Sequence, residues 1–206
     1  MLQDLDKTLE ELLKQNLPSD LARQISFSFD TPDRESISKT PAINFFLYDI
    51  RENLELRSNV NIFERPDDGP ALKRRPPARV DCSYIVTAWP TKPSDPEQEH
   101  QLLGAVMAVL LRYRKLPANI LQGSLVGQQP PVRAKALRPS QLQSLGEFWQ
   151  AIGGKPKATL NYTITLAIAV HDEIEKIPVI TEREISLGIG TPPKELERKI
   201  AKPQIL

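Results

Sequence analysis

The sequence predicts a single mixed α/β domain, with helices packed against a mixed β-sheet. Three patterns predict it: an amphipathic leucine repeat at the start, strand-like runs at residues 80–89 (β-branched and aromatic) and 159–170 (alternating), and a long apolar segment from residue 96. A chain of 206 residues usually forms one domain and is long enough to bury a core. With 40% hydrophobic and 26% charged residues, the composition is typical of a globular protein rather than a disordered one.

The first expected elements are a helix and a strand. Leucines recur at helical spacing, at positions Leu2, Leu5, Leu9, Leu12 and Leu13. Pro18 should end this helix, because the residue before a proline is pushed out of the helical region. Residues 25–29 then alternate between apolar and polar, which predicts a half-buried strand.

The next run, at residues 42–50, is apolar at successive positions. That pattern predicts a central strand covered on both faces. We expect residues 51–53 to turn the chain into a short hairpin partner at residues 54–57.

Residues 64–79 are rich in proline and carry the cluster Lys73-Arg74-Arg75. This composition predicts an exposed loop without a helix or strand of its own. Because strand candidates flank it on both sides, we interpret it as an insertion within one domain rather than a linker. The predicted organisation is therefore one domain at residues 1–171, with this loop inside it, and an extension at residues 172–206.

A strongly specified helix follows the strand at residues 80–89. Asp95 can cap it, Pro96 suits its first position, and Gln98 occupies the capping-box position. The helix should extend to about Lys115, and its nearly continuous apolar residues predict that most of it is buried.

The last two expected elements are a helix and a long strand. The helix should begin at Pro139 and end at Gly153-Gly154, and the strand should span the alternating residues 159–170.

Catalytic chemistry has little support in this sequence. His100 stands at an expected helix start, where a packing role is the more frequent one, and no spacing joins it and His171 to other metal-ligating residues. Cys82 lies inside a strand pattern and is expected to be a small core residue. Gly153-Gly154-Lys155-Pro156 lacks the preceding strand and the Ser or Thr of a phosphate-binding loop. We therefore predict no catalytic, cofactor-binding or metal-binding residue, no cofactor and no enzyme activity.

Charge and composition also limit location and partners. A net charge of +1 argues against a dedicated nucleic-acid binder. One cysteine excludes an intrachain disulfide framework and suits a reducing compartment. The sequence shows neither a secretory leader nor an apolar run of the roughly 18 residues that a membrane span needs. We expect a cytoplasmic protein that does not itself insert into a membrane.

One charge asymmetry is pronounced. Residues 101–146 contain no acidic side chain, yet they carry six basic ones: Arg112, Arg114, Lys115, Arg133, Lys135 and Arg138. One interpretation is a solvated face that is balanced by acidic clusters elsewhere in the chain. The other is a docking surface for an acidic partner, to which the cluster Lys73-Arg74-Arg75 would also contribute.

Four blocks of this sequence, taken in order, resemble one known family. They lie at residues 41–57, 76–89, 99–104 and 148–163, and they include "SYIVTAW" and "EHQLLG". Together they are similar to the cap, or tube-terminator, proteins of contractile injection systems, a family long catalogued only as a domain of unknown function. The resemblance extends over roughly residues 2–170.

The resemblance implies a fold like that of phage tail terminators and a structural role. Such proteins form a homohexameric ring on the last layer of the inner tube and the sheath, at the end opposite the baseplate. The implied partners are other copies of the chain, the tube protein and the sheath protein. The implied location is an assembled particle, either released or anchored to a membrane through partners. The alternative is an assembly adaptor or chaperone for tube and sheath subunits that is not retained in the particle.

Overall fold

The computed structural model describes residues 1–64, 70–93, 95–139, 142, 144–170 and 175–177. They belong to two compact units. The larger unit comprises Met1–Arg57 and Pro77–Ile168, and the smaller comprises Ser58–Pro76 together with residues from Ala169 onward. Each unit is described by itself below.

The larger unit is built on a five-stranded sheet with the strand order β1-β2-β5-β7-β6. β1 runs parallel to β2, whereas the other neighbours are antiparallel, so the prediction of a mixed α/β fold is confirmed. The strands are β1 (Ser26–Ser28), β2 (Ala42–Glu52), β5 (Ala78–Trp89), β6 (Arg133–Ala136) and β7 (Leu160–Ile168).

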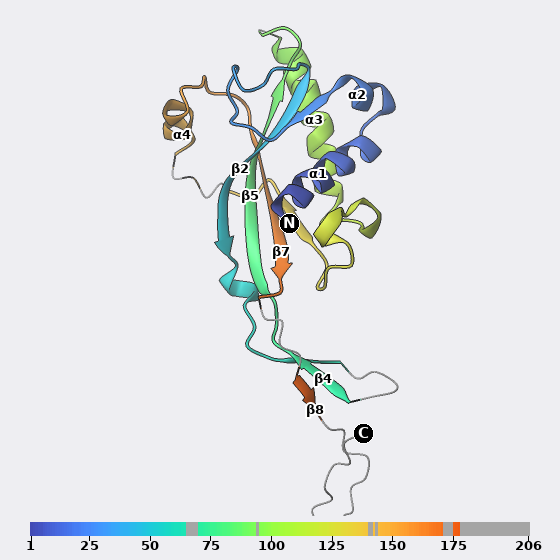
Figure 1. The fold of residues 1–206 in the computed structure, drawn as a ribbon. Coiled ribbons are helices and arrows are strands. Elements are labelled where there is room, and N and C mark those ends of the chain that lie inside the picture. Colours follow the sequence, from blue (N-terminus) through green and yellow to red (C-terminus); the bar gives the residue numbers. More distant parts are fainter. Residues whose placement is uncertain (65–69, 94, 140–141, 143, 171–174, 178–206) are drawn as a thin grey trace, which may run out of the picture. The chain divides into compact units, whose positions relative to one another are not determined.

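Helices α1 (Leu2–Asn16) and α3 (Pro96–Arg112) lie on the same face of this sheet (Figure 1). Their leucines and valines form one core with alternate residues of β2, β5 and β7. Fully burying one such side chain is worth about 1.5–3 kcal/mol, so this shared core is what holds the helices on the sheet. The shorter elements are α2 (Ser19–Gln24), η2 (Ala118–Ile120) and η3 (Gly123–Leu125).

The predicted boundaries of the two long helices have clear local causes. Leu17, which precedes Pro18, has extended backbone angles and ends α1. The Asp95 side chain accepts a hydrogen bond from the Gln98 backbone N–H at 2.9 Å and caps α3. The Gln98 side chain does not close a capping box, since it accepts from the Thr91 N–H instead. α3 ends at Arg112 rather than Lys115, because Tyr113 is already extended.

Burial of α3 is less complete than predicted. Leu102, Leu103, Val106, Val109 and Leu110 are buried, but Met107 and Leu111 on the outer side of the helix are exposed. One face of the helix therefore forms core, and the opposite face meets solvent.

Two other predictions are wrong, and side-chain capping explains both. Residues 54–57 do not form a hairpin strand: Asn53 accepts from the Leu56 N–H at 3.0 Å and caps the 3-10 helix η1 (Leu54–Leu56). The helix expected from Pro139 begins at Leu145, because the Ser144 hydroxyl accepts from the Glu147 N–H and caps α4 (Leu145–Ala151).

The smaller unit contains a three-stranded antiparallel sheet of β3 (Ile62–Glu64), β4 (Ala71–Arg74) and β8 (Glu175–Ile177). β4 lies inside residues 64–79, for which the sequence predicted no strand. β4 pairs with β3 and with β8, and β8 lies about a hundred residues later in the sequence. Pairing between strands so far apart cannot be predicted from the residues around β4 alone.

Candidate docking surface

The face of the five-stranded sheet opposite α1 and α3 is polar near β6. Along β5, Cys82 and Tyr84 belong to the core beneath the helices, so Arg79, Asp81 and Ser83 point to the opposite face. One end of that face is covered by α4, where the Phe148 ring lies 5.9 Å from the ring of Phe46.

The pairing of β5, β7 and β6 aligns the remaining polar side chains of this face in two rows that run across the strands. Asp81 of β5 is in register with Thr165 of β7, which is in register with Arg133 of β6. The next row contains Ser83, Thr163 and Lys135. Each row therefore runs from the middle of the sheet to a basic residue on its edge strand.

Asp81 is the fixed centre of this surface. One carboxylate oxygen accepts from Asn53 Nδ2 at 2.8 Å, and the other accepts from Thr165 Oγ1 at 2.6 Å. Because both oxygens are engaged, Asp81 acts as an anchor that joins η1, β5 and β7. It is poorly placed to serve as a general base.

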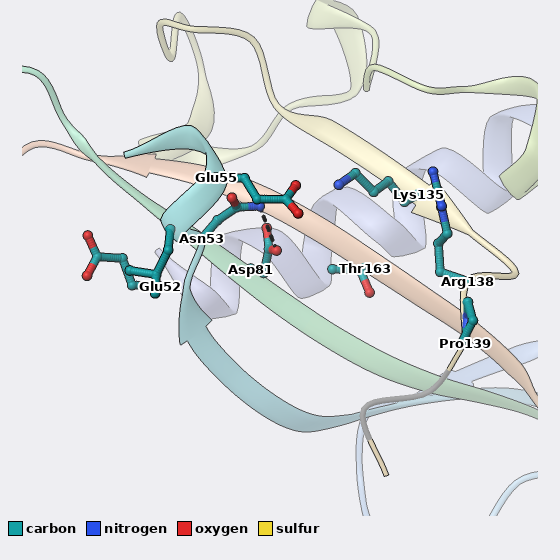
Figure 2. A pocket seen from close by; sticks show the side chains of 9 residues that line it. Glu52, Asn53, Glu55, Asp81, Lys135, Arg138, Pro139 and Thr163 are labelled. Atoms are coloured by element: carbon teal, nitrogen blue, oxygen red, sulfur yellow. Dashed lines mark hydrogen bonds between the residues drawn. The ribbon is translucent and has the colours of Figure 1, made fainter. Parts of the chain in front are cut away.

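Asp81, Thr163 and Lys135 of these rows line a pocket of about 550 Å³ that contains both signs of charge. Lys135 and Arg138 line it together with Glu52, Glu55 and Asp81. Figure 2 shows the Glu55 and Lys135 side chains extending toward one another, with Asp81 and Thr163 below them in this view. The acid-free segment 101–146 therefore meets acidic residues that come from other segments. A pocket of this kind suits ionic contacts with a polypeptide rather than bond-making chemistry.

The structure also brings together Arg114, Lys115 and Arg133. The Ala134 N–H donates to the Arg114 carbonyl at 2.9 Å, and the Leu116 N–H donates to the Val132 carbonyl at 3.0 Å. These bonds hold the segment after α3 against the edge of β6 and place Lys115 opposite Arg133. With Arg112 at the end of α3, this group of basic residues lies at one edge of the larger unit and is exposed.

The other three predicted contact residues, Lys73, Arg74 and Arg75, belong to the smaller unit. Arg74 and Arg75 are exposed, and Arg74 forms an ion pair of 3.0 Å with Glu64. At least part of this cluster is thus neutralised within its own sheet.

The residues weighed for catalysis fit structural roles. Cys82 is fully buried, and burial raises the pKa of its thiol to about 12, so the reactive thiolate is scarce at neutral pH. His100 is exposed on the first turns of α3, and His171 lies outside the described residues. Within the described part of the chain, no three His, Cys, Asp or Glu side chains are grouped as a metal site would need, and no helix could span a membrane.

Sequence reasoning gave no role to Asn53 and Asp81, whose hydrogen bond joins η1 to β5, or to Arg79. A charged residue within a strand pattern, as at Asp81, is the one signal that could have marked the site. The burial of Arg79, which is only 6% exposed, has no counterpart in the sequence pattern.

Comparison with known proteins supplies a family and a fold. The model of the Pvc16 N-terminal domain family matches residues 4–182. No curated protein gives a significant match.

Two solved structures resemble this chain along most of its length. A sheath/tube terminator of the extracellular contractile injection system PVC, in the extended state, has a TM-score of 0.62 and 26% identity over 93% of this chain and 64% of its own. The tube-terminating cap of the anti-feeding prophage has a TM-score of 0.61 and 26% identity over 91% of this chain and 62% of its own. This chain therefore spans somewhat less than two thirds of either protein.

Proposed function

Because the chain belongs to the Pvc16 N-terminal domain family, we propose that it is a structural cap of a contractile injection system. In this proposal it terminates the inner tube and the sheath at the end distal to the baseplate. The observation that carries the proposal is the shared fold: the chain matches a sheath/tube terminator and a tube-terminating cap over nine tenths of its length.

The proposed mechanism is geometric. Stacked rings grow through heterologous contacts, in which one face of each ring fits the opposite face of the next, and such growth continues until a different surface ends it. A cap subunit offers one face that fits the last ring and lacks the face that would receive another. The mixed-charge pocket and the basic edge at β6 are suited to fixing the register of such a contact.

We infer a homohexameric ring as the assembled form, with the tube and sheath proteins as its partners. The role is non-enzymatic and needs no cofactor. Buried Cys82 and doubly hydrogen-bonded Asp81 are consistent with a scaffold. The cap assembles in the cytoplasm as part of the particle, and any later release or membrane attachment depends on its partners.

Deletion of the gene, with the wild-type gene restored as the control, tests the proposal. Electron micrographs of the deletion strain should show tubes and sheaths of uncontrolled length, or unstable particles that lack density at one end. Particles of normal length and stability would contradict a terminating role.

The second candidate, an adaptor or chaperone that leaves the particle, predicts a different result from the same preparation. Quantitative mass spectrometry of purified wild-type particles should find a cap in a fixed ratio to the baseplate proteins. An adaptor would be absent from the particles, although its deletion would still impair assembly.

A further inference from the structure

Arg79 is a largely buried arginine that forms no side-chain hydrogen bond or ion pair with the residues that the structure describes. The residue is 6% exposed, and its Nε is buried and forms no hydrogen bond. No other described residue forms an ion pair with its guanidinium. Buried arginines are rare unless they are paired, because the guanidinium stays charged at every physiological pH. Among the described residues, the opposite charge that acts on Arg79 is that of Asp81, and no ion pair joins the two side chains.

The position of Arg79 relates it to the docking surface. It lies on β5 opposite Ala167 of β7, two residues before Asp81, and so it points to the same polar face. Arg133, on the edge strand, belongs to the row of Asp81 and Thr165. Two cations thus border one end of the polar face.

The electrostatics agree with this geometry. The pKa of Arg79 is lowered, first by burial and then by the charge of Arg133, while Asp81 acts in the opposite direction. Asp81 does not pair with Arg79 directly, since its two oxygens accept from Asn53 and Thr165. An added anion would relieve both the desolvation of Arg79 and its repulsion by Arg133.

The surrounding charges define the class of anion. A guanidinium fits both carboxylates and phosphates, and often binds them through two parallel hydrogen bonds. The negative charge of Asp81, which acts on Arg79, would repel a polyanion such as a nucleic acid or an anionic membrane surface. A single carboxylate on a protein side chain experiences less of that repulsion.

We propose that Arg79, with Arg133, forms a binding site for an acidic side chain of a neighbouring protein subunit. The identity of that neighbour as a component of the same particle rests on the proposed function. The existence of a carboxylate site does not rest on the proposed function, because the purified chain can be tested alone.

The first experiment records the Nε–Hε NMR signal of Arg79, assigned with Arg79→Lys, during titration of the full chain at constant ionic strength. Acetate is the probe, acetamide is its neutral isostere, and inorganic phosphate stands for a polyanion. A saturable shift with acetate that exceeds the shifts with acetamide and phosphate is expected. Equal shifts with acetate and acetamide, or a larger one with phosphate, would overturn the carboxylate assignment.

The second experiment uses Arg79→Met, which keeps much of the side-chain volume but removes the charge. Because the charge forms no ion pair with the described residues, the thermal stability of the variant should be unchanged or higher. Retention of the variant on particles should fall about tenfold or more, since a buried charge-assisted pair is lost. Arg23→Met, at an exposed site on α2, is the control and should retain normal attachment.

A lower melting temperature for Arg79→Met would indicate a structural role and overturn the proposal, as would normal retention on particles. These results are separable from failure of the cap function. If the chain is not a cap, either its deletion leaves particles normal or the chain is absent from purified particles, whereas the acetate titration still reports on the site.

Discussion

The Lys157 ammonium nitrogen lies 2.5 Å from Glu99 Oε2, and the two side chains are only 16% and 15% exposed. The same nitrogen lies 4.8 Å from the centroid of the Trp89 ring. Trp89 ends β5, Glu99 lies in the first turn of α3, and Lys157 precedes β7. One cation therefore joins three segments that are separate in sequence, and two of them contain the family-like blocks "SYIVTAW" and "EHQLLG".

We expect Lys157→Met to lower the free energy of unfolding by about 1–3 kcal/mol, because it leaves the Glu99 carboxylate partly buried without a partner. Denaturant unfolding measures the change, and Lys155→Met, at an exposed neighbouring site, is the matched control. The double variant with Glu99→Gln should cost less than the sum of the single changes. Equal effects at Lys155 and Lys157 would mean that the pair adds nothing to stability.

Asp6 should give the protein a pH-dependent stability. Its Oδ1 accepts from the Tyr84 hydroxyl at 3.0 Å, but burial, the larger influence, raises the pKa of the carboxyl above its ordinary 3.8. Folding thus favours the protonated form. The contribution is complete below pH 3.8 and is lost as the pH rises through the folded-state pKa.

Asp6→Asn keeps a hydrogen-bond acceptor and removes this charge. Its free energy of unfolding, relative to wild type, should therefore increase from acidic to neutral pH. Chemical denaturation across that range measures the difference, and Asp20→Asn on the exposed side of α2 is the control. A difference that stays constant with pH would show that Asp6 is not desolvated in the folded protein.

Cys82 should be inert in the native protein. It is fully buried, and the pKa of its thiol is about 12, so alkylation requires the protein to open. Mass spectrometry should show negligible modification by iodoacetamide under native conditions and rapid modification in denaturant. Fast labelling of the native protein would show that the Cys82 thiolate is accessible and would contradict its assignment as an inert core residue.

The sequence correctly predicted those helices and strands whose cause lies within a few neighbouring residues. The leucine repeat of α1, the Asp95 cap of α3 and the alternation of β7 are each readable within a short window, and all three elements form as expected. The failures at η1 and α4 arise because one short side chain, Asn53 or Ser144, captures a nearby backbone N–H. Such capture outweighs the hydrophobic pattern around it.

The site was predictable only in part, for a related reason. The basic run at residues 101–146 is visible in the sequence, but the residues facing it, Glu52, Glu55 and Asp81, come from β2, η1 and β5. Only the register of the sheet shows that Asp81, Thr165 and Arg133 share a row. Only the folded surface shows which acidic residues lie opposite the basic segment. The sequence alone therefore could not decide whether this segment is a solvated face or a docking surface.

The structure now divides that segment into two groups with different expected behaviour. Lys135 and Arg138 share a pocket with three carboxylates, so Lys135→Glu with Arg138→Glu should lower the melting temperature of the isolated chain by adding like charges there. Arg112 and Arg114 are exposed, and neither forms an ion pair with another described residue. Reversing these two to glutamate should leave the melting temperature unchanged.

If Arg112 and Arg114 face an acidic partner, their reversal should also weaken attachment of the chain to particles. Single exposed pairs are worth only about 0–1 kcal/mol, but a ring repeats each contact in every subunit. The loss should be largest at low salt and shrink as salt increases, because the screening length is about 10 Å at 0.1 M and about 3 Å at 1 M. Quantifying the chain on particles washed at both salt concentrations decides between the two interpretations. Full retention of the double variant at low salt would show that this end of α3 is a solvated face.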